Sequence, residues 1–251
     1  MNAFIEKLRA GEARLGLWRA LTDPYTAEIC ARAGYGWLMF DGEHAPNTLP
    51  TLLAQLQAVA PFPVEPVARP PAGEAWMIKQ YLDIGFRTLL APMVDGPEQA
   101  AALVAATRFP PRGVRGVASA TSRASGFGAE PGYLAHAHER TGLIVQIETR
   151  AGLAAIDSIA ATDGVDALFI GPADLSAALG HLGDPRHPDA QAAIDDGFAR
   201  IRASGKPAGI FALDAEDARR RLAQGFAFVS VGTDIGVLSA GARALRERCE
   251  G

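Results

Sequence analysis

The chain has 251 residues, of which 49% are hydrophobic and 21% charged, and it contains 27 glycines. This composition supplies enough apolar side chains for a folded core and excludes an intrinsically disordered protein. A formal net charge of −4 provides no basic field for a phosphate backbone, which argues against nucleic acid as a partner.

Targeting signals and reactive cysteines are not evident in the sequence. Met1–Gly11 is charged and lacks an apolar signal core, and no later stretch offers the roughly 18 apolar residues of a membrane span. Cys30 and Cys249 lie far apart and outside any Cys-x-x-Cys or Cys/His cluster, so we expect reduced thiols. These features predict a cytoplasmic protein with no membrane partner.

Eight short apolar runs of strand length alternate with stretches of helical spacing. The runs are Arg14–Trp18, Trp37–Asp41, Glu65–Ala68, Thr88–Ala91, Leu143–Glu148, Ala167–Ile170, Ala208–Phe211 and Phe228–Val231. The spacing of Tyr25, Ile29 and Ala33 indicates one of the helices, and glycines such as Gly85 end several helices just before the next run. Eight alternating units predict a parallel α/β sheet closed into a (β/α)8 TIM barrel, with residues 1–251 as a single domain. The alternative, an open doubly wound sheet, is weakened because no Gly-x-Gly-x-x-Gly follows the first run.

Two intervals between predicted strands are longer than one helix requires. Arg108–Gly126 is rich in proline, glycine, serine and arginine, and it predicts a long loop at the top of the barrel. Such loops usually serve function or contacts between subunits. Leu175–Lys206 predicts a short helix, a proline-rich turn at Gly183–Pro188 and a longer helix.

Polar side chains stand where the predicted strands end. They are Asp41, Glu43 and His44 after the second run, Arg69 after the third, Gln146 and Glu148 in the fifth, and Asp174 after the sixth. Active-site groups of TIM barrels occupy the carboxyl ends of the strands. Four strands therefore predict one reaction site, and His44 is first considered there as a metal ligand.

Gln146 and Glu148 are two residues apart on a strand, so both side chains point into the barrel. A buried carboxylate is costly unless it is paired or binds a metal, and the alternative to a metal is an ion pair of Glu148 with Arg69 or Arg150. Asp174 either caps a short helix or joins Glu148 in a two-carboxylate oxygen site suited to Mg²⁺ or Mn²⁺.

The lysines bear on how a carbanion next to a carbonyl is stabilised. Lys7, Lys79 and Lys206 are the only lysines, and none follows the carboxyl end of a predicted strand. A Schiff base requires such an amine, so a metal-held enolate is the expected alternative. His44 suits proton transfer near neutral pH, with Asp83 as its orienting partner. The alternatives are a partly buried polar His44 and a solvated Asp83.

These residues, in this order, resemble the metal-dependent (class II) pyruvate aldolases of the 4-hydroxy-2-oxoheptanedioate (hydroxyketoacid) aldolase family. The resemblance covers nearly the whole chain and rests on the motifs Gly16–Trp18, Phe40–Pro46, Pro110–Gly116, Val145–Thr149 and Phe169–Ser176. It implies a homohexamer, a trimer of dimers, with C-terminal helices exchanged between neighbouring subunits.

The resemblance implies a divalent metal, Mg²⁺, Mn²⁺ or Co²⁺, held by Glu148 and Asp174, and no nucleotide cofactor. The keto and carboxylate oxygens of pyruvate complete the metal shell, seated by Gln146 and the backbone near Ala173. Arg69 is implied to stabilise the developing enolate oxygen.

The resemblance further implies that His44, oriented by Asp83, is the base acting through a metal-bound water. Asp41 is similar to a residue near the aldehyde end. The loop around Val117 and Ala118 is implied to reach a neighbouring subunit's site.

The expected activity is reversible cleavage of 4-hydroxy-2-oxo acids to pyruvate and an aldehyde. Trp18 and Arg19 at the first strand end, with Phe211 and Leu213 at the seventh, are candidates for the aldehyde pocket. The alternatives are a related acyl-CoA lyase of the malyl-CoA or citryl-CoA type and a non-catalytic barrel that binds a small acid.

Overall fold

Eight parallel strands close into a barrel in the computed structural model, which describes residues 1–250. The strands are β1 (Arg14–Arg19), β2 (Trp37–Asp41), β3 (Glu65–Arg69), β4 (Thr88–Ala91), β5 (Gly142–Ile147), β6 (Ala167–Ile170), β7 (Ala208–Ala212) and β8 (Phe228–Thr233). Each strand pairs with its neighbour in sequence, and β1 also pairs with β8. The predicted (β/α)8 barrel is confirmed, and the predicted strand ends lie within two residues of the observed ones.

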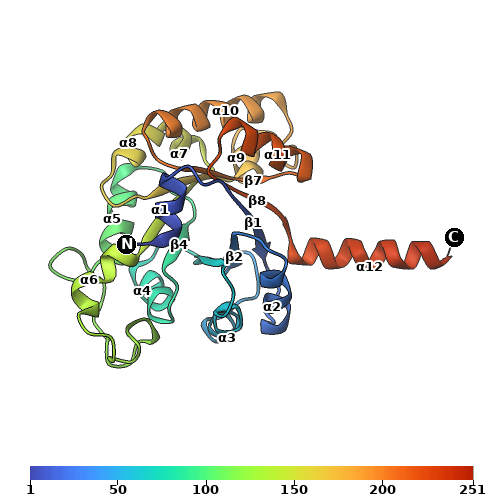
Figure 1. Cartoon of the computed structure of the whole chain (residues 1–251). Helices are drawn as coiled ribbons and strands as arrows, with labels where there is room; N and C mark the ends of the chain where they lie inside the picture. Colours follow the sequence, from blue (N-terminus) through green and yellow to red (C-terminus); the bar gives the residue numbers. More distant parts are fainter. Residues whose placement is uncertain (251) are drawn as a thin grey trace.

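Helices surround the barrel (Figure 1). They are α1 (Ala3–Arg9), α2 (Pro24–Arg32), α3 (Leu49–Val59), α4 (Ala75–Asp83), α5 (Pro97–Thr107), the 3-10 turn η1 (Arg123–Ser125), α6 (Tyr133–Arg140), α7 (Arg150–Ala154), α8 (Ile156–Ala161), α9 (Pro172–Ala178), α10 (Pro188–Ala203), α11 (Ala215–Gln224) and α12 (Asp234–Glu250). The predicted division of Leu175–Lys206 into a short helix, a turn and a longer helix is confirmed by α9 and α10. None of the helices in residues 1–250 is both long and apolar enough to span a bilayer.

The barrel has an inner core and an outer core. The inner core fills the barrel, whereas the outer core lies between the strands and the surrounding helices. On β5, Ile144 belongs to the inner core and Ile147 to the outer one, as the two-residue period of a strand requires. Gln146 and Glu148, on the inward face, are 3% and 2% exposed. The prediction that both point into the barrel is thereby confirmed.

Helix α1 closes the amino end of the barrel. The ring of Phe4 lies 6.2 Å from Trp37 and 6.1 Å from Phe228, the first residues of β2 and β8. Asn2 accepts hydrogen bonds from the backbone N–H groups of Phe4 and Ile5 and so caps this helix. With apolar rings filling this end, the carboxyl ends of the strands remain for the polar site.

The long loop after α5 lies at the amino end of the barrel, so its predicted place at the top is wrong. The loop follows a helix that runs antiparallel to the strands and has returned to the end where they begin. Its contacts agree with this position, because Arg115 pairs with Asp83 at 2.6 Å and Arg123 donates to the carbonyl of Ile84 at 3.1 Å. Both partners lie at the end of α4, just before β4 begins.

Helix α12 projects from the barrel as a single rod (Figure 1). At its base, Asp234 forms a buried ion pair with Arg19 at 3.1 Å. Farther along, Ile235, Leu238 and Leu245 recur at helical spacing and are 45%, 61% and 57% exposed. The helix therefore presents an unpaired apolar stripe beyond the barrel.

Candidate active site

Asp41 and Arg69 form the buried centre of the polar rim. Asp41 ends β2 and Arg69 ends β3, and the strand register places them side by side. Arg69 donates through Nε and a terminal nitrogen to the two oxygens of Asp41 at 3.0 and 2.7 Å, and Trp18 donates to Asp41 at 3.0 Å. Burial raises the pKa of Asp41, but the Arg69 hydrogen bonds and charge, with the Trp18 bond, bring it below its usual value. Asp41 is therefore an ionised carboxylate locked to Arg69.

Glu43 and His44 extend this pair toward solvent. The second terminal nitrogen of Arg69 lies 2.8 Å from Glu43, and Nε2 of His44 lies 3.7 Å from the same carboxylate. Burial raises the pKa of Glu43 despite the opposing charges of Arg69 and His44. The His44 side chain is 68% exposed, so it is accessible to a substrate at the rim.

Glu148 is held on the inward face just after β5. Its Oε1 accepts a hydrogen bond from the backbone N–H of Met93 at 2.9 Å, and its Oε2 accepts one from Gln146. Burial, with smaller contributions from the charges of Asp174 and Glu43, raises the pKa of Glu148 to about 7. The alternative ion pairs are not observed, because Arg69 pairs with Asp41 and Glu43, while Arg150 donates to the carbonyl of Ala178.

Asp174 and Ala173 lie exposed in the first turn of α9. Asp174 makes no capping hydrogen bond for this helix, so the capping alternative is not realised. Its charge raises the pKa of both Glu148 and Glu43, which shows that the three carboxylates share one electrostatic environment.

The donor atoms around Glu148 suit a hard divalent ion. Gln146 Oε1 is buried and accepts no hydrogen bond among the described residues, and the neighbouring ligands are carboxylate oxygens. Carbonyl and carboxylate oxygens are the ligands that Mg²⁺ and Mn²⁺ prefer. Gly171 keeps the space clear, since a Cβ there would stand 2.7 Å from Glu148 Oε2. Glu148, Asp174 and Gln146 therefore fit the implied metal.

The residues predicted for the aldehyde pocket lie on both faces of the sheet. The rings of Trp18 and Phe211 meet edge to face at 5.4 Å inside the barrel, and Leu213 follows β7 at its carboxyl end. Arg19 points the other way and donates to Gln55 at 2.9 Å among the helices. Arg19 as a pocket residue is therefore wrong, because successive strand residues face opposite sides of the sheet.

Asp83, Val117 and Ala118 lie away from the rim of their own chain. Asp83 is held by Arg115 at the amino end of the barrel, and no hydrogen bond joins it to His44 among the described residues. Val117 and Ala118 are exposed in the loop at that same end. The expected pairing of Asp83 with His44 is not made within one chain.

Sequence reasoning missed two parts of the site. Met93 holds Glu148 from a backbone with a φ of 55°, a strained conformation for this residue, and its carbonyl accepts from Gln99 at 3.0 Å. A cavity of about 690 Å³ begins beside Glu43 and Met93 and continues between the segment Pro71–Ala75 and α5. A strained turn formed by an apolar residue has no signal in a single sequence, whereas Glu43 was visible between Asp41 and His44.

The sequence pattern of the HpcH/HpaI aldolase/citrate lyase family matches residues 14–240. The chain belongs to this family. A hydroxypyruvate/pyruvate aldolase from Pseudomonas aeruginosa is 56% identical over 251 residues, which cover 100% of this chain and 94% of that protein. A 4-hydroxy-2-oxo-heptane-1,7-dioate aldolase from Klebsiella pneumoniae subsp. pneumoniae is 50% identical, with 98% and 93% covered.

The HpcH/HpaI fold extends over the whole molecule. A crystal structure of a family member from Burkholderia cenocepacia J2315 matches with a TM-score of 0.96 and 42% identity, and the match covers 100% of both chains. Family membership and the two aldolase relatives make this protein a carbon–carbon lyase of the aldolase type. The expected enzyme class is thereby confirmed. Members of the family generally depend on a divalent metal ion.

Proposed function

We propose that the protein catalyses reversible cleavage of 4-hydroxy-2-oxo acids to pyruvate and an aldehyde. The observation that carries this proposal is the pair of polar groups at the carboxyl end of the barrel, Glu148 with Gln146 on one side and Arg69 with Asp41 on the other. Glu148 and Gln146 can hold a metal ion. Asp41 fixes the positively charged guanidinium of Arg69. The names of the aldolase relatives support pyruvate and a hydroxyketoacid as the small-molecule partners.

Glu148 and Asp174 are the proposed metal ligands, with Gln146 and the backbone of Ala173 beside them to seat the substrate. A bound Mg²⁺, Mn²⁺ or Co²⁺ supplies a Lewis acid for the oxygens of the 2-oxo acid. Glu148 is only 2% exposed, so its carboxylate is shielded from bulk solvent. Its pKa near 7 favours exchange of the proton for a cation at neutral pH.

Arg69 is proposed to stabilise the negative charge that develops on the 2-oxo oxygen. Its Nε and both terminal nitrogens already contact Asp41 or Glu43, which fixes the plane of the guanidinium. Each terminal nitrogen carries a second N–H, which remains available to a substrate oxygen. Donors that are fixed before the reaction stabilise developing charge most effectively.

His44 is proposed to take the proton from the 4-hydroxyl of the substrate. Its imidazole is exposed at the rim, and the negative charge of Glu43 beside it stabilises the protonated form once the proton has been taken. Trp18, Phe211 and Leu213 are proposed to line the aldehyde side, with Asp41 at the boundary.

Assembly is proposed to complete the site. Asp83 and Ala118 lie at the amino end of their own barrel, so they can act on His44 and the aldehyde only from a neighbouring subunit. The apolar stripe of α12 supports an exchange of this helix between subunits. We therefore propose a homohexamer, a trimer of dimers.

The test is pyruvate release from 4-hydroxy-2-oxo acids before and after chelation. We expect activity to be lost on chelation and restored by Mg²⁺ or Mn²⁺, whereas borohydride with pyruvate leaves the enzyme active. Asp174→Asn is expected to prevent the restoration. Full activity of metal-free enzyme contradicts the metal mechanism, and turnover of malyl-CoA without turnover of free hydroxyketoacids contradicts the substrate class.

A further inference from the structure

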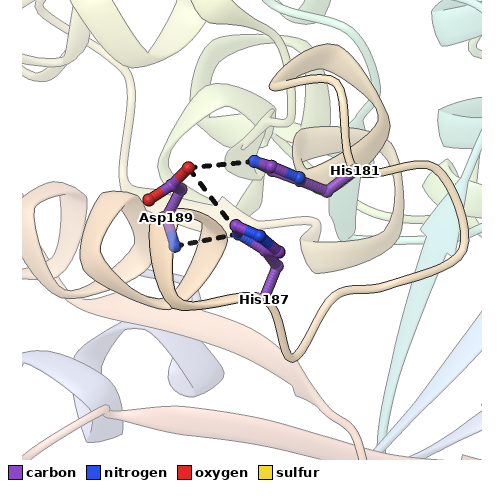
Figure 2. A group of neighbouring side chains, drawn as sticks. All are labelled: His181, His187 and Asp189. Atoms are coloured by element: carbon purple, nitrogen blue, oxygen red, sulfur yellow. Dashed lines mark hydrogen bonds and ion pairs between the residues drawn. The ribbon is translucent and has the colours of Figure 1, made fainter.

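A second group of potential metal ligands lies in the segment that joins α9 to α10 (Figure 2). Nε2 of His181 lies 3.1 Å from Oδ2 of Asp189, and Nδ1 of His187 lies 3.7 Å from the same oxygen. One ligand atom from each of the three side chains falls within 4.8 Å of the others. The group thus combines two imidazoles with one carboxylate around one point.

The two imidazole rings are unusually close. Their centroids are 3.4 Å apart and their planes differ by 11°. The two imidazoles therefore lie side by side next to the Asp189 carboxylate, although they come from opposite ends of the turn. Arg186 lies on the same segment, but its guanidinium pairs with Asp214 and not with Asp189.

We propose that His181, His187 and Asp189 bind one borderline divalent transition ion, of which Zn²⁺ is the best fit. Imidazole ligands suit Zn²⁺, Ni²⁺ and Cu²⁺, whereas Mg²⁺ prefers an all-oxygen set such as the one around Glu148. Bonds of about 2.0–2.1 Å in a tetrahedral shell place two nitrogens roughly 3.3 Å apart. One ligand atom from each side chain already lies within 4.8 Å of the others, so rotation of the imidazoles out of their stacked arrangement brings both nitrogens to this separation, and water takes the fourth position.

The competing role of this cluster is helix capping. Nδ1 of His187 accepts a hydrogen bond from the backbone N–H of Asp189 at 3.2 Å at the start of α10. An ion at Nδ1 replaces that hydrogen bond, whereas an ion at Nε2 leaves it in place. Capping alone does not account for His181, which lies on the other side of the turn and contacts the start of α10 only through the side chain of Asp189 among the described residues.

The proposed ion links this cluster to the helix that carries Asp174. The backbone N–H of His181 donates to the carbonyl of Ser176 in α9 at 2.8 Å. An ion shared with His187 and Asp189 therefore joins the end of α9 to the start of α10. The inference does not rest on the proposed aldolase chemistry, because none of the three ligands belongs to that site.

The experiment measures Zn²⁺ binding to untagged protein in excess Mg²⁺, by equilibrium dialysis with elemental analysis. The background is the Glu148→Gln/Asp174→Asn double variant, which removes the carboxylates at the catalytic site. We expect about one Zn²⁺ per chain to remain. His181→Ala removes a ligand and should weaken binding at least about 10-fold, since loss of a group that only supports a ligand already costs about 10- to 100-fold. His136→Ala is the matched control, since His136 faces Glu139 at 3.1 Å but belongs to no group of three potential ligands among the described residues.

A second readout needs no change in the cluster. Cu²⁺ bound to the same background protein should show coupling to two imidazole nitrogens in its electron paramagnetic resonance spectrum. His187→Asn should remove one of these couplings while its side chain still caps α10. Absence of zinc from the background protein, equal binding by His181→Ala, or equal loss in His136→Ala overturns the site. Aldolase activity in Mg²⁺ is measured separately on wild type, whose proposed catalytic site contains none of the three ligands, so the two proposals fail separately.

Discussion

Arg69 is the residue whose geometry most constrains the proposed chemistry. Arg69→Lys keeps a positive charge but loses the planar set of N–H donors that binds Asp41 and leaves N–H groups for the substrate. We expect kcat for pyruvate release to fall about 10²- to 10³-fold, the effect of removing one preorganised donor. Arg32→Lys, at an exposed pair with Glu28, is the control. An unchanged kcat in Arg69→Lys removes Arg69 from the mechanism.

The raised pKa of Glu148 should make the stability of the metal-free enzyme depend on pH. Its pKa is raised from 4.5 to about 7 in the fold, chiefly by burial, so the native state holds the proton more tightly than the unfolded chain. The protonated Glu148 carboxyl therefore stabilises the native state relative to the unfolded chain. This stabilisation is complete below pH 4.5 and is lost as pH rises through 7, by about 3 kcal/mol in total. We expect the free energy of unfolding of wild type to decrease between pH 5 and 8 relative to that of Glu148→Gln.

In Glu148→Gln, the new side-chain amide can form a hydrogen bond with Gln146. Gln146 Oε1 lacks a hydrogen bond in the described residues, so a rotated Gln146 amide can accept from a glutamine at position 148. Denaturant titrations of chelated protein at several pH values measure the difference. Parallel curves for both proteins contradict the raised pKa. Adding Mg²⁺ at pH 8 should stabilise wild type more than the variant.

At the residue scale, the sequence predicted positions better than partners. The two-residue period of a strand placed Gln146 and Glu148 inside the barrel, because that period follows from backbone geometry alone. The same period, applied to Trp18 and Arg19, shows that only one of them faces the interior, and the prediction overlooked it. The support of Glu148 by Met93 depends on a contact between β4 and β5 segments that no local pattern records.

At the scale of elements, all eight strands were recognisable because buried parallel strands are short continuous apolar runs bounded by glycine and polar residues. The position of the loop after α5 was not, since its composition shows that it is a loop but not which end of the barrel it joins. The position of Asp83, at the end of α4 and away from His44 of its own chain, was not recognised for the same reason. A residue at the end of a helix in this fold lies opposite the residues that end the strands.

A charge in the apolar stripe of helix α12 should weaken the assembly. Leu238→Glu places a charge in the apolar stripe, and each leucine that is buried in an interface contributes about 1.5–3 kcal/mol. We expect the variant to form smaller species than wild type in sedimentation velocity experiments at equal concentration. Leu182→Glu, at a leucine 87% exposed outside α12, is the control. An unchanged assembly in Leu238→Glu contradicts a role of the stripe in the hexamer.

At the scale of the whole molecule, Arg19 and Asp234 join the first strand of the barrel to the helix that follows the last. Asp234 also accepts hydrogen bonds from the backbone N–H groups of Ala20 and Leu21, so one carboxylate holds the end of β1 against the start of α12. Both charged side chains are almost fully buried. Closure of the barrel and the direction of α12 therefore depend on the same contact.

Asp234→Ala leaves the Arg19 guanidinium buried without its carboxylate. Removing one partner of a buried ion pair costs about 3–5 kcal/mol, whereas an exposed pair contributes much less because water and salt screen it. We expect urea titrations to show the larger loss for Asp234→Ala and the smaller loss for Asp157→Ala, which removes an exposed partner of Arg200. Because α12 starts at Asp234, the first variant should also form less of the full assembly at a concentration where the second remains intact. Equal losses of stability in the two variants show that this ion pair does not hold the barrel closed.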